Sequence, residues 1–173
     1  NNSTIYGCVV QLTTYLKAPL ACQHYSMSKI SVRVYGVLRD EQGRVLVSDE
    51  KIRGDLFTKF PGGGLEFGEG TRDCLVRELK EELNLSVQAD DHIYTTDFFQ
   101  RSAFNEAHQI LSIYYGLIAL EPLNIDLDKK PFTFTEESIA SYAATQQMES
   151  FRLIPWEQFN AEAMSLPIDK VVA

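Results

Sequence analysis

Five closely spaced glycines followed by a helix-like segment with three glutamates limit what this chain can fold into. The glycines are Gly62, Gly63, Gly64, Gly68 and Gly70. When the residues that follow are placed about 100° apart on a helical wheel, three leucines form an apolar stripe: Leu75, Leu79 and Leu83. Three glutamates fall together on the adjacent arc: Glu78, Glu81 and Glu82. The segment therefore predicts a helix with one buried face and a carboxylate cluster beside it.

The glutamate cluster has two interpretations. Glu78 is a helix neighbour of both other glutamates, and each like-charged pair at this spacing costs roughly 0.2–0.5 kcal/mol. A divalent ion such as Mg²⁺ or Mn²⁺ would relieve the repulsion, because these ions prefer carboxylate oxygens. Alternatively, the cluster is a solvated face on which Arg77 pairs with Glu81 at i,i+4.

The glycines favour the first interpretation. A glycine-rich turn before a helix lets backbone N–H groups approach a phosphate closely. A phosphate cradle beside a carboxylate–metal site points to chemistry on a phosphate ester or anhydride.

The spacing of these residues resembles the signature of the Nudix hydrolases. The family pattern has glycine, five residues, glutamate, seven residues and then Arg-Glu-apolar-any-Glu-Glu-any-Gly-apolar. The chain matches it from Gly63 through Glu69 and Arg77 to Leu85, except that Asn84 replaces the second fixed glycine. That glycine ends the helix in the left-handed conformation, and Asn is the next-best residue for it.

The resemblance implies both a fold and a reaction. The expected fold is α/β (α+β), a Nudix-like α/β/α sandwich with a mixed central sheet and a loop-helix-loop catalytic motif. The expected reaction is hydrolysis of a phosphoanhydride bond in a nucleoside diphosphate-linked substrate, with Mg²⁺ or Mn²⁺ as cofactor. By matching position, the metal ligands would be Glu78, Glu81, Glu82 and the Gly63 carbonyl. Arg77 would orient a glutamate through a salt bridge, and Glu69 would support the loop or a metal-bound water.

The resemblance leaves the general base and the substrate open. The base is a glutamate of the signature or one of four later residues: Glu106, Glu136, Glu137 and Glu149. We expect the substrate to contact Arg53 and three of the glycines: Gly62, Gly63 and Gly64. Since motifs of several known subfamilies are absent, a nucleoside triphosphate or a nucleotide sugar is the expected small-molecule partner. The alternative is a nucleotide-binding sensor or interaction module of the same fold without turnover, and the family also makes a homodimer possible.

Composition limits the binding partners and the cellular compartment that we expect for this protein. A net charge of −8 argues against non-specific binding of nucleic acid. The three cysteines lack metal-ligand spacing and favour a reducing compartment, so we expect a cytoplasmic protein. Residues 1–26 are too polar to span a membrane, and we interpret them as an N-terminal extension preceding a single domain over residues 27–173.

Hydrophobic patterning predicts the remaining elements. Residues 30–49 are expected to form a hairpin around a turn at 40–43, and residues 51–59 a loop. Strands are expected at 108–120 and 149–154. A helix capped by Thr133 or Thr135 is expected through residues 139–144, and a last helix over residues 156–164.

Overall fold

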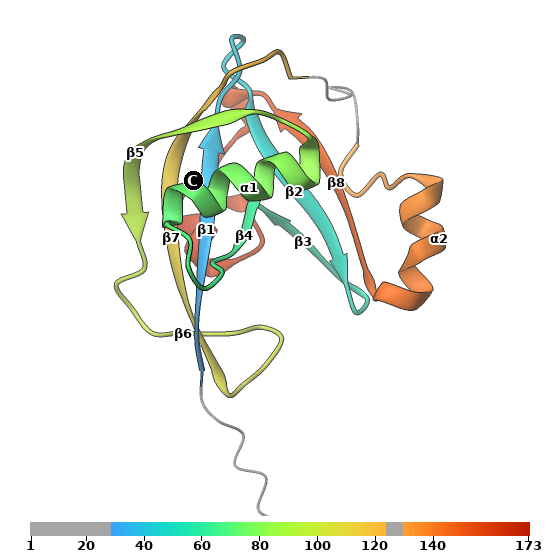
Figure 1. Ribbon diagram of the computed structural model, residues 1–173. Helices are drawn as coiled ribbons and strands as arrows, with labels where there is room; N and C mark the ends of the chain where they lie inside the picture. The colour runs from blue at the N-terminus through green and yellow to red at the C-terminus, as the bar shows by residue number, and fades with distance from the viewer. Residues whose placement is uncertain (1–28, 124–129) are drawn as a thin grey trace, which may run out of the picture.

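The computed structural model describes residues 29–123 and 130–173 (Figure 1). The predicted extension over residues 1–26 lies outside the described residues, as do Cys8 and Cys22. In the described part of the chain, no helix combines the length and the apolar character needed to cross a membrane.

Two sheets form the centre of the fold. The larger has the order β4-β1-β7-β5, with β6 also pairing with β7. Its strands are β4 (Gly62–Gly64), β1 (Lys29–Leu38), β7 (His108–Ala119), β5 (Val87–Thr95) and β6 (Gln100–Arg101). The smaller sheet is antiparallel, with the order β3 (Asp55–Lys59), β2 (Val45–Ile52) and β8 (Gln147–Ile154). Because β1 runs parallel to β7 while the other pairs are antiparallel, the larger sheet is mixed, as predicted.

Helices cover both faces of the larger sheet. Successive side chains of a strand point to opposite faces, so Val34 and Tyr35 of β1 belong to two different cores. Val34 packs in one core with Leu75 and Leu79 of α1 (Thr71–Leu83). The other core unites Tyr35 with residues of β7 and of the C-terminal helix α3 (Pro167–Val172). The third helix, α2 (Glu136–Thr145), packs against β8 (Figure 1). The predicted α/β/α arrangement is thus confirmed.

The predicted hairpin over residues 30–49 is wrong, although its turn is right. Asp40 accepts hydrogen bonds from the backbone N–H groups of Gln42 and Arg44, and Gly43 has a φ of 76°. Beyond one bridge between Arg39 and Val45, however, the two strands separate into different sheets. The alternation of apolar residues defines the buried face of a strand but not its partner.

The chain after β2 and after β8 also differs from expectation. The predicted loop over residues 51–59 contains β3, which pairs with β2. The predicted helix over residues 156–164 is two short 3₁₀ turns, η1 (Trp156–Gln158) and η2 (Ala161–Ala163). Extended backbone at Phe159 and Asn160 separates them, and the Asn160 side chain caps the second turn by accepting from the N–H of Glu162. The cap of α2 is confirmed, because the Thr135 hydroxyl accepts from the N–H of Ser138.

Candidate active site

The first part of the glycine run forms an edge strand rather than the predicted turn. Gly62–Gly64 pairs antiparallel with β1, in register with Tyr35, Val34 and Arg33. Gly62 has a φ of 130°, and a Cβ there would overlap the carbonyl of Val34. A Cβ at Gly63 would overlap the carboxylate of Glu78. Glycine at position 63 therefore lets a helix glutamate lie directly against the strand.

Helix α1 begins after Gly70 and ends at Asn84, which has φ 49° and ψ 29° in the left-handed region. The N–H of Asn84 donates to the carbonyl of Lys80, and the N–H of Leu85 donates to the carbonyl of Leu79. The replacement of the usual glycine by Asn84 thus preserves the left-handed end expected of the signature.

Arg77 joins the carboxylates of the signature. Its guanidinium donates to Glu69 through Nε at 3.1 Å and Nη2 at 2.8 Å. Nη1 donates to Glu78 at 3.0 Å and to Glu81 at 3.1 Å, and Nη2 reaches the carbonyl of Gly64 at 3.2 Å. Glu69 also accepts from the N–H of Glu66, and its hydrogen bonds from Arg77 lower its pKa to about 2. Arg77 therefore holds Glu78 and ties the loop to the helix.

A cleft of about 1050 Å³ opens beside this helix. Of the predicted residues it is lined by Arg53, Gly63, Gly64, Glu78 and Glu82. Glu81 lies outside it, with a side chain 60 % exposed and bonded to Arg77, and Gly62 does not line it either. Of the later glutamates only Glu149 lines the cleft, whereas the others are exposed: Glu106, Glu136 and Glu137.

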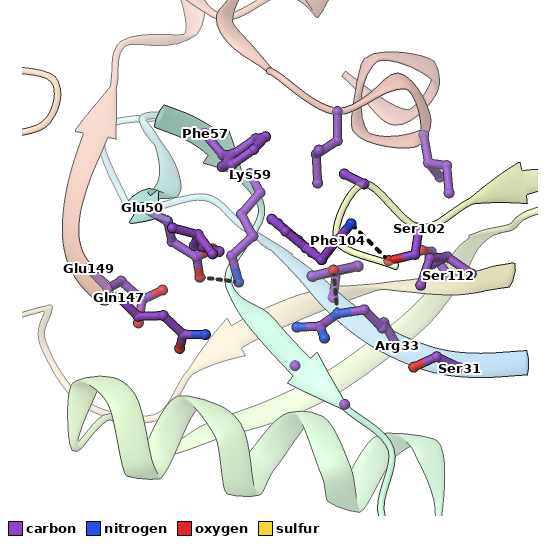
Figure 2. A pocket seen from close by; sticks show the side chains of 18 of the residues that line it. Ser31, Arg33, Glu50, Phe57, Lys59, Ser102, Phe104, Ser112, Gln147 and Glu149 are labelled. Atoms are coloured by element: carbon purple, nitrogen blue, oxygen red, sulfur yellow. Dashed lines mark hydrogen bonds and ion pairs between the residues drawn. The ribbon is translucent and has the colours of Figure 1, made fainter. Parts of the chain in front are cut away.

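A second group of charged residues faces α1 across this cleft. Glu50 on β2 and Glu149 on β8 are directly opposite each other in the sheet register. Lys59 on β3 is buried, and its ammonium lies 2.9 Å from Glu50 and 3.1 Å from the carbonyl of Gly62. The hydroxyl of Ser48 donates to Glu149. Figure 2 shows Glu50, Lys59 and Glu149 projecting from the smaller sheet at one end of the cleft.

Negative charge exceeds positive charge at this end. Burial, and next the charge of Glu149, raise the pKa of Glu82 to about 8. Burial likewise raises the pKa of Glu149 to about 6, against the lowering effect of Lys59. Among the described residues, the buried Oε2 of Glu82 has no hydrogen-bond partner. Three carboxylates thus act on one buried ammonium, those of Glu50, Glu82 and Glu149. Glu78 adds a fourth negative charge beside Glu82.

The donor set fits a hard divalent cation. Carboxylate and carbonyl oxygens are the ligands that Mg²⁺ and Mn²⁺ prefer, and the unpartnered Glu82 oxygen is available to one. Within residues 29–123 and 130–173, no three acidic, His or Cys side chains converge closely enough to enclose an ion as they stand. A cation would therefore share its coordination with water or substrate, as Mg²⁺ commonly does in phosphate-processing sites.

Comparison with known proteins agrees with this geometry. The NUDIX domain model matches residues 29–171, which is most of the chain. The protein belongs to the Nudix family. The predicted family and fold class are thereby confirmed. Nudix hydrolases generally use a divalent metal, consistent with the donor set.

Individual relatives of this Nudix chain are distant. It is 33 % identical over 64 residues to an 8-oxo-dGTP diphosphatase of Escherichia coli, a match covering 36 % of the chain and 49 % of that protein. It is 28 % identical over 121 residues to Nudix hydrolase 2 of Arabidopsis thaliana, covering 66 % of the chain and 35 % of that protein. The chain thus spans half or less of the length of these relatives. The chain is also similar to the solution structure of the E. coli ORF135 protein, with a TM-score of 0.55 and 17 % sequence identity. The match covers 85 % of this chain and 87 % of that one, so the two proteins share a fold.

Sequence reasoning missed Glu50 and Lys59 as cleft residues. A usable signal was present at one of them. In β2, Ser48, Asp49 and Glu50 place polar residues on both faces of a strand that begins with three apolar residues, and Ser48 and Asp49 are buried. Buried polar groups need partners, so such a run indicates either a structural network or a site.

Proposed function

We propose that this Nudix protein is a metal-dependent pyrophosphohydrolase that cleaves a phosphoanhydride bond in a nucleoside diphosphate-linked substrate. The observation that carries the proposal is the surplus of half-buried carboxylates around Glu82 in a cleft large enough for a nucleotide. The name of the E. coli relative, a diphosphatase, supports the same reaction class.

Glu78, Glu82 and the Gly63 carbonyl are the groups we propose to hold Mg²⁺ or Mn²⁺. Glu78 rests against Gly63 and is held there by Arg77, so its carboxylate is already oriented. Glu81, which resemblance to the family includes among the ligands, lies outside the cleft, and its Oε2 accepts from Arg77. A divalent ion bound there would neutralise part of the diphosphate charge and would lower the pKa of the attacking water molecule.

Glu149 is the residue we propose as general base. It is the one later glutamate of the predicted set that lines the cleft. Burial raises its pKa to about 6, close to the pH at which a base works efficiently. Lys59, held between Glu50 and the Gly62 carbonyl, keeps a positive charge beside this carboxylate and limits the rise.

Product analysis tests this proposal. The chain is incubated with Mg²⁺ and a panel of nucleoside triphosphates, oxidised dGTP, ADP-ribose, nucleotide sugars and dinucleoside polyphosphates. We expect at least one compound to be cleaved at its phosphoanhydride bond, with activity lost on chelation and restored by Mg²⁺ or Mn²⁺. Ligand-induced stabilisation without turnover under either metal would instead favour a binding module.

A further inference from the structure

Arg33 lies on β1 beside the edge strand, in register with Gly64 on one side and Ser112 of β7 on the other. Since Val34 packs under α1, Arg33 projects from the opposite face of the sheet, where it lines the cleft. Figure 2 shows Arg33, Ser31 and Ser112 at the end of the cleft away from Glu50 and Glu149.

A buried chain of side chains holds the Arg33 guanidinium. Its Nε donates to the hydroxyl of Tyr35 at 2.8 Å. Tyr35 is 4 % exposed, and its ring stacks on Tyr114 with the centroids 5.4 Å apart. The hydroxyl of Tyr114 in turn donates to the buried Asp169 of α3 at 2.6 Å. Arg33 is thus placed by the core, in the way that binding residues are placed when their geometry matters.

The guanidinium of Arg33 has no directly paired carboxylate in the part of the chain that the structure describes, although the charges of Glu50 and Glu78 act on it from farther away. Arg77 and Arg152 both form ion pairs, and Lys59 is paired with Glu50. In the described residues, by contrast, no carboxylate lies within ion-pair distance of Arg33. A guanidinium has five N–H donors, and one is used by Tyr35. A half-buried guanidinium with unused donors and no directly paired carboxylate suits this side of the cleft to an anion.

The groups around Arg33 suit the oxygens of such an anion. The hydroxyl residues Ser31, Ser102 and Ser112 line the same part of the cleft. Guanidinium and hydroxyl groups are common donors to phosphate and carboxylate oxygens, and arginine binds both in a forked geometry.

We propose that Arg33 binds an anionic group, a phosphate or a carboxylate, on the moiety joined to the diphosphate, so that the preferred substrates carry negative charge at both ends. This inference rests on the proposed function for the position of the diphosphate at the glutamate end. It makes Arg33 a specificity-determining residue.

Two matched pairs of compounds test the subsite. UDP-glucuronate and UDP-glucose differ by a carboxylate, and NADPH and NADH differ by a phosphate. Each is measured for kcat/KM in the wild type and in Arg33→Gln, Arg33→Lys and Arg39→Gln. The last variant removes the same charge from an arginine that lies over Trp156 and does not line the cleft. Calorimetric titration of the same compounds into the Glu82→Gln protein, with and without Arg33→Gln, measures their binding affinity in the absence of turnover.

We expect the wild type to prefer the charged member of at least one pair. Arg33→Gln should lower kcat/KM for that member roughly 10- to 100-fold and leave kcat/KM for the uncharged member nearly unchanged. Arg33→Lys should retain part of the preference, and Arg39→Gln should retain all of it. The pair that shows the effect distinguishes carboxylate from phosphate.

Three results would overturn the subsite: no preference by binding in either pair, an equal loss of both members in Arg33→Gln, or a preference that Arg33→Gln leaves intact. Equal loss would place Arg33 on the shared diphosphate. If no compound is hydrolysed but the binding preference appears and disappears with Arg33, the subsite stands and the proposed hydrolysis fails. If Arg33→Gln does not fold, the wild-type preference and Arg33→Lys decide.

Discussion

Asp49 and Glu50 are consecutive residues of β2 that point to opposite faces, and their partners differ completely. Asp49 is 1 % exposed and accepts from Arg152 twice, from the hydroxyl of Thr58 and from the N–H of Phe132. Glu50 shares one ammonium, that of Lys59, with Glu149 and Glu82. One face therefore holds a carboxylate whose partners all come from the chain. The other holds carboxylates that outnumber the cations around them among the described residues, an arrangement that suits an external cation.

Glu82→Gln gives the largest expected effect and tests the uncompensated side. Turnover should fall roughly 10²- to 10⁴-fold, because a proposed ligand of the cation is lost. The melting temperature should stay level or rise, since the substitution removes a half-buried carboxyl whose ionised form burial and Glu149 disfavour. Steady-state kinetics and thermal melts on the same preparation check both. Near-normal turnover in a folded variant would remove Glu82 from the metal site.

Asp49→Asn tests the compensated side. The free energy of unfolding should fall by about 3–5 kcal/mol, because the change leaves the largely buried Arg152 without its carboxylate. The expected loss appears as a lower midpoint in urea denaturation, and activity per folded molecule should change little. A loss of activity without a loss of stability would contradict the division between the two faces.

Asp169 offers an intermediate case, with Oδ1 bonded to Tyr114 and a buried Oδ2 that has no partner among the described residues. Burial raises its pKa to about 7. The folded state therefore binds more protons than the unfolded state between about pH 4 and pH 7, and stability falls as the pH rises through this range. The contribution is on the order of 3–4 kcal/mol. Urea denaturation at several pH values should show this slope in the wild type relative to Asp169→Asn, and parallel curves would refute it.

Asn84→Gly gives the smallest expected effect and serves as a control for the helix that carries Glu82. Glycine tolerates the left-handed backbone at this position better than asparagine. Stability should therefore rise by a few tenths of a kcal/mol to about 1 kcal/mol, with kcat/KM unchanged. A large change in activity would mean that the end of α1 has a role in the site.

Local sequence patterns predicted the helix and its contacts well. The spacing of leucines and glutamates predicted α1, and the i,i+4 pair of Arg77 and Glu81 is present. The left-handed end at Asn84 and the Thr135 cap also follow from nearest neighbours in the chain. These features depend on residues within one or two helical turns, where propensity and spacing suffice.

Features that depend on distant segments were not predictable in this way. The apolar alternation of β1 does not reveal that its neighbours are β7 and β4. Glu50 lies opposite Glu149 because of the register between β2 and β8. Arg33 contacts Tyr35, and Tyr35 stacks on Tyr114, because the strands that carry them pack side by side in the core. The last helix was misplaced because the extended backbone at Phe159 and Asn160 has no strong local breaker in the sequence.

The parallel pairing of β1 with β7 has a consequence for biosynthesis. Ten successive residue pairs, from Lys29 with His108 to Leu38 with Leu117, join segments separated by the whole signature. On a translating ribosome, β1, β4 and α1 emerge before the strand that completes their sheet. The nascent chain therefore carries an apolar helix face and an open strand edge until β7 appears, and such edges favour chaperone binding or aggregation. Pairings this distant in sequence also slow folding, so slower translation after residue 119 would give the sheet time to close before the C-terminal segments arrive.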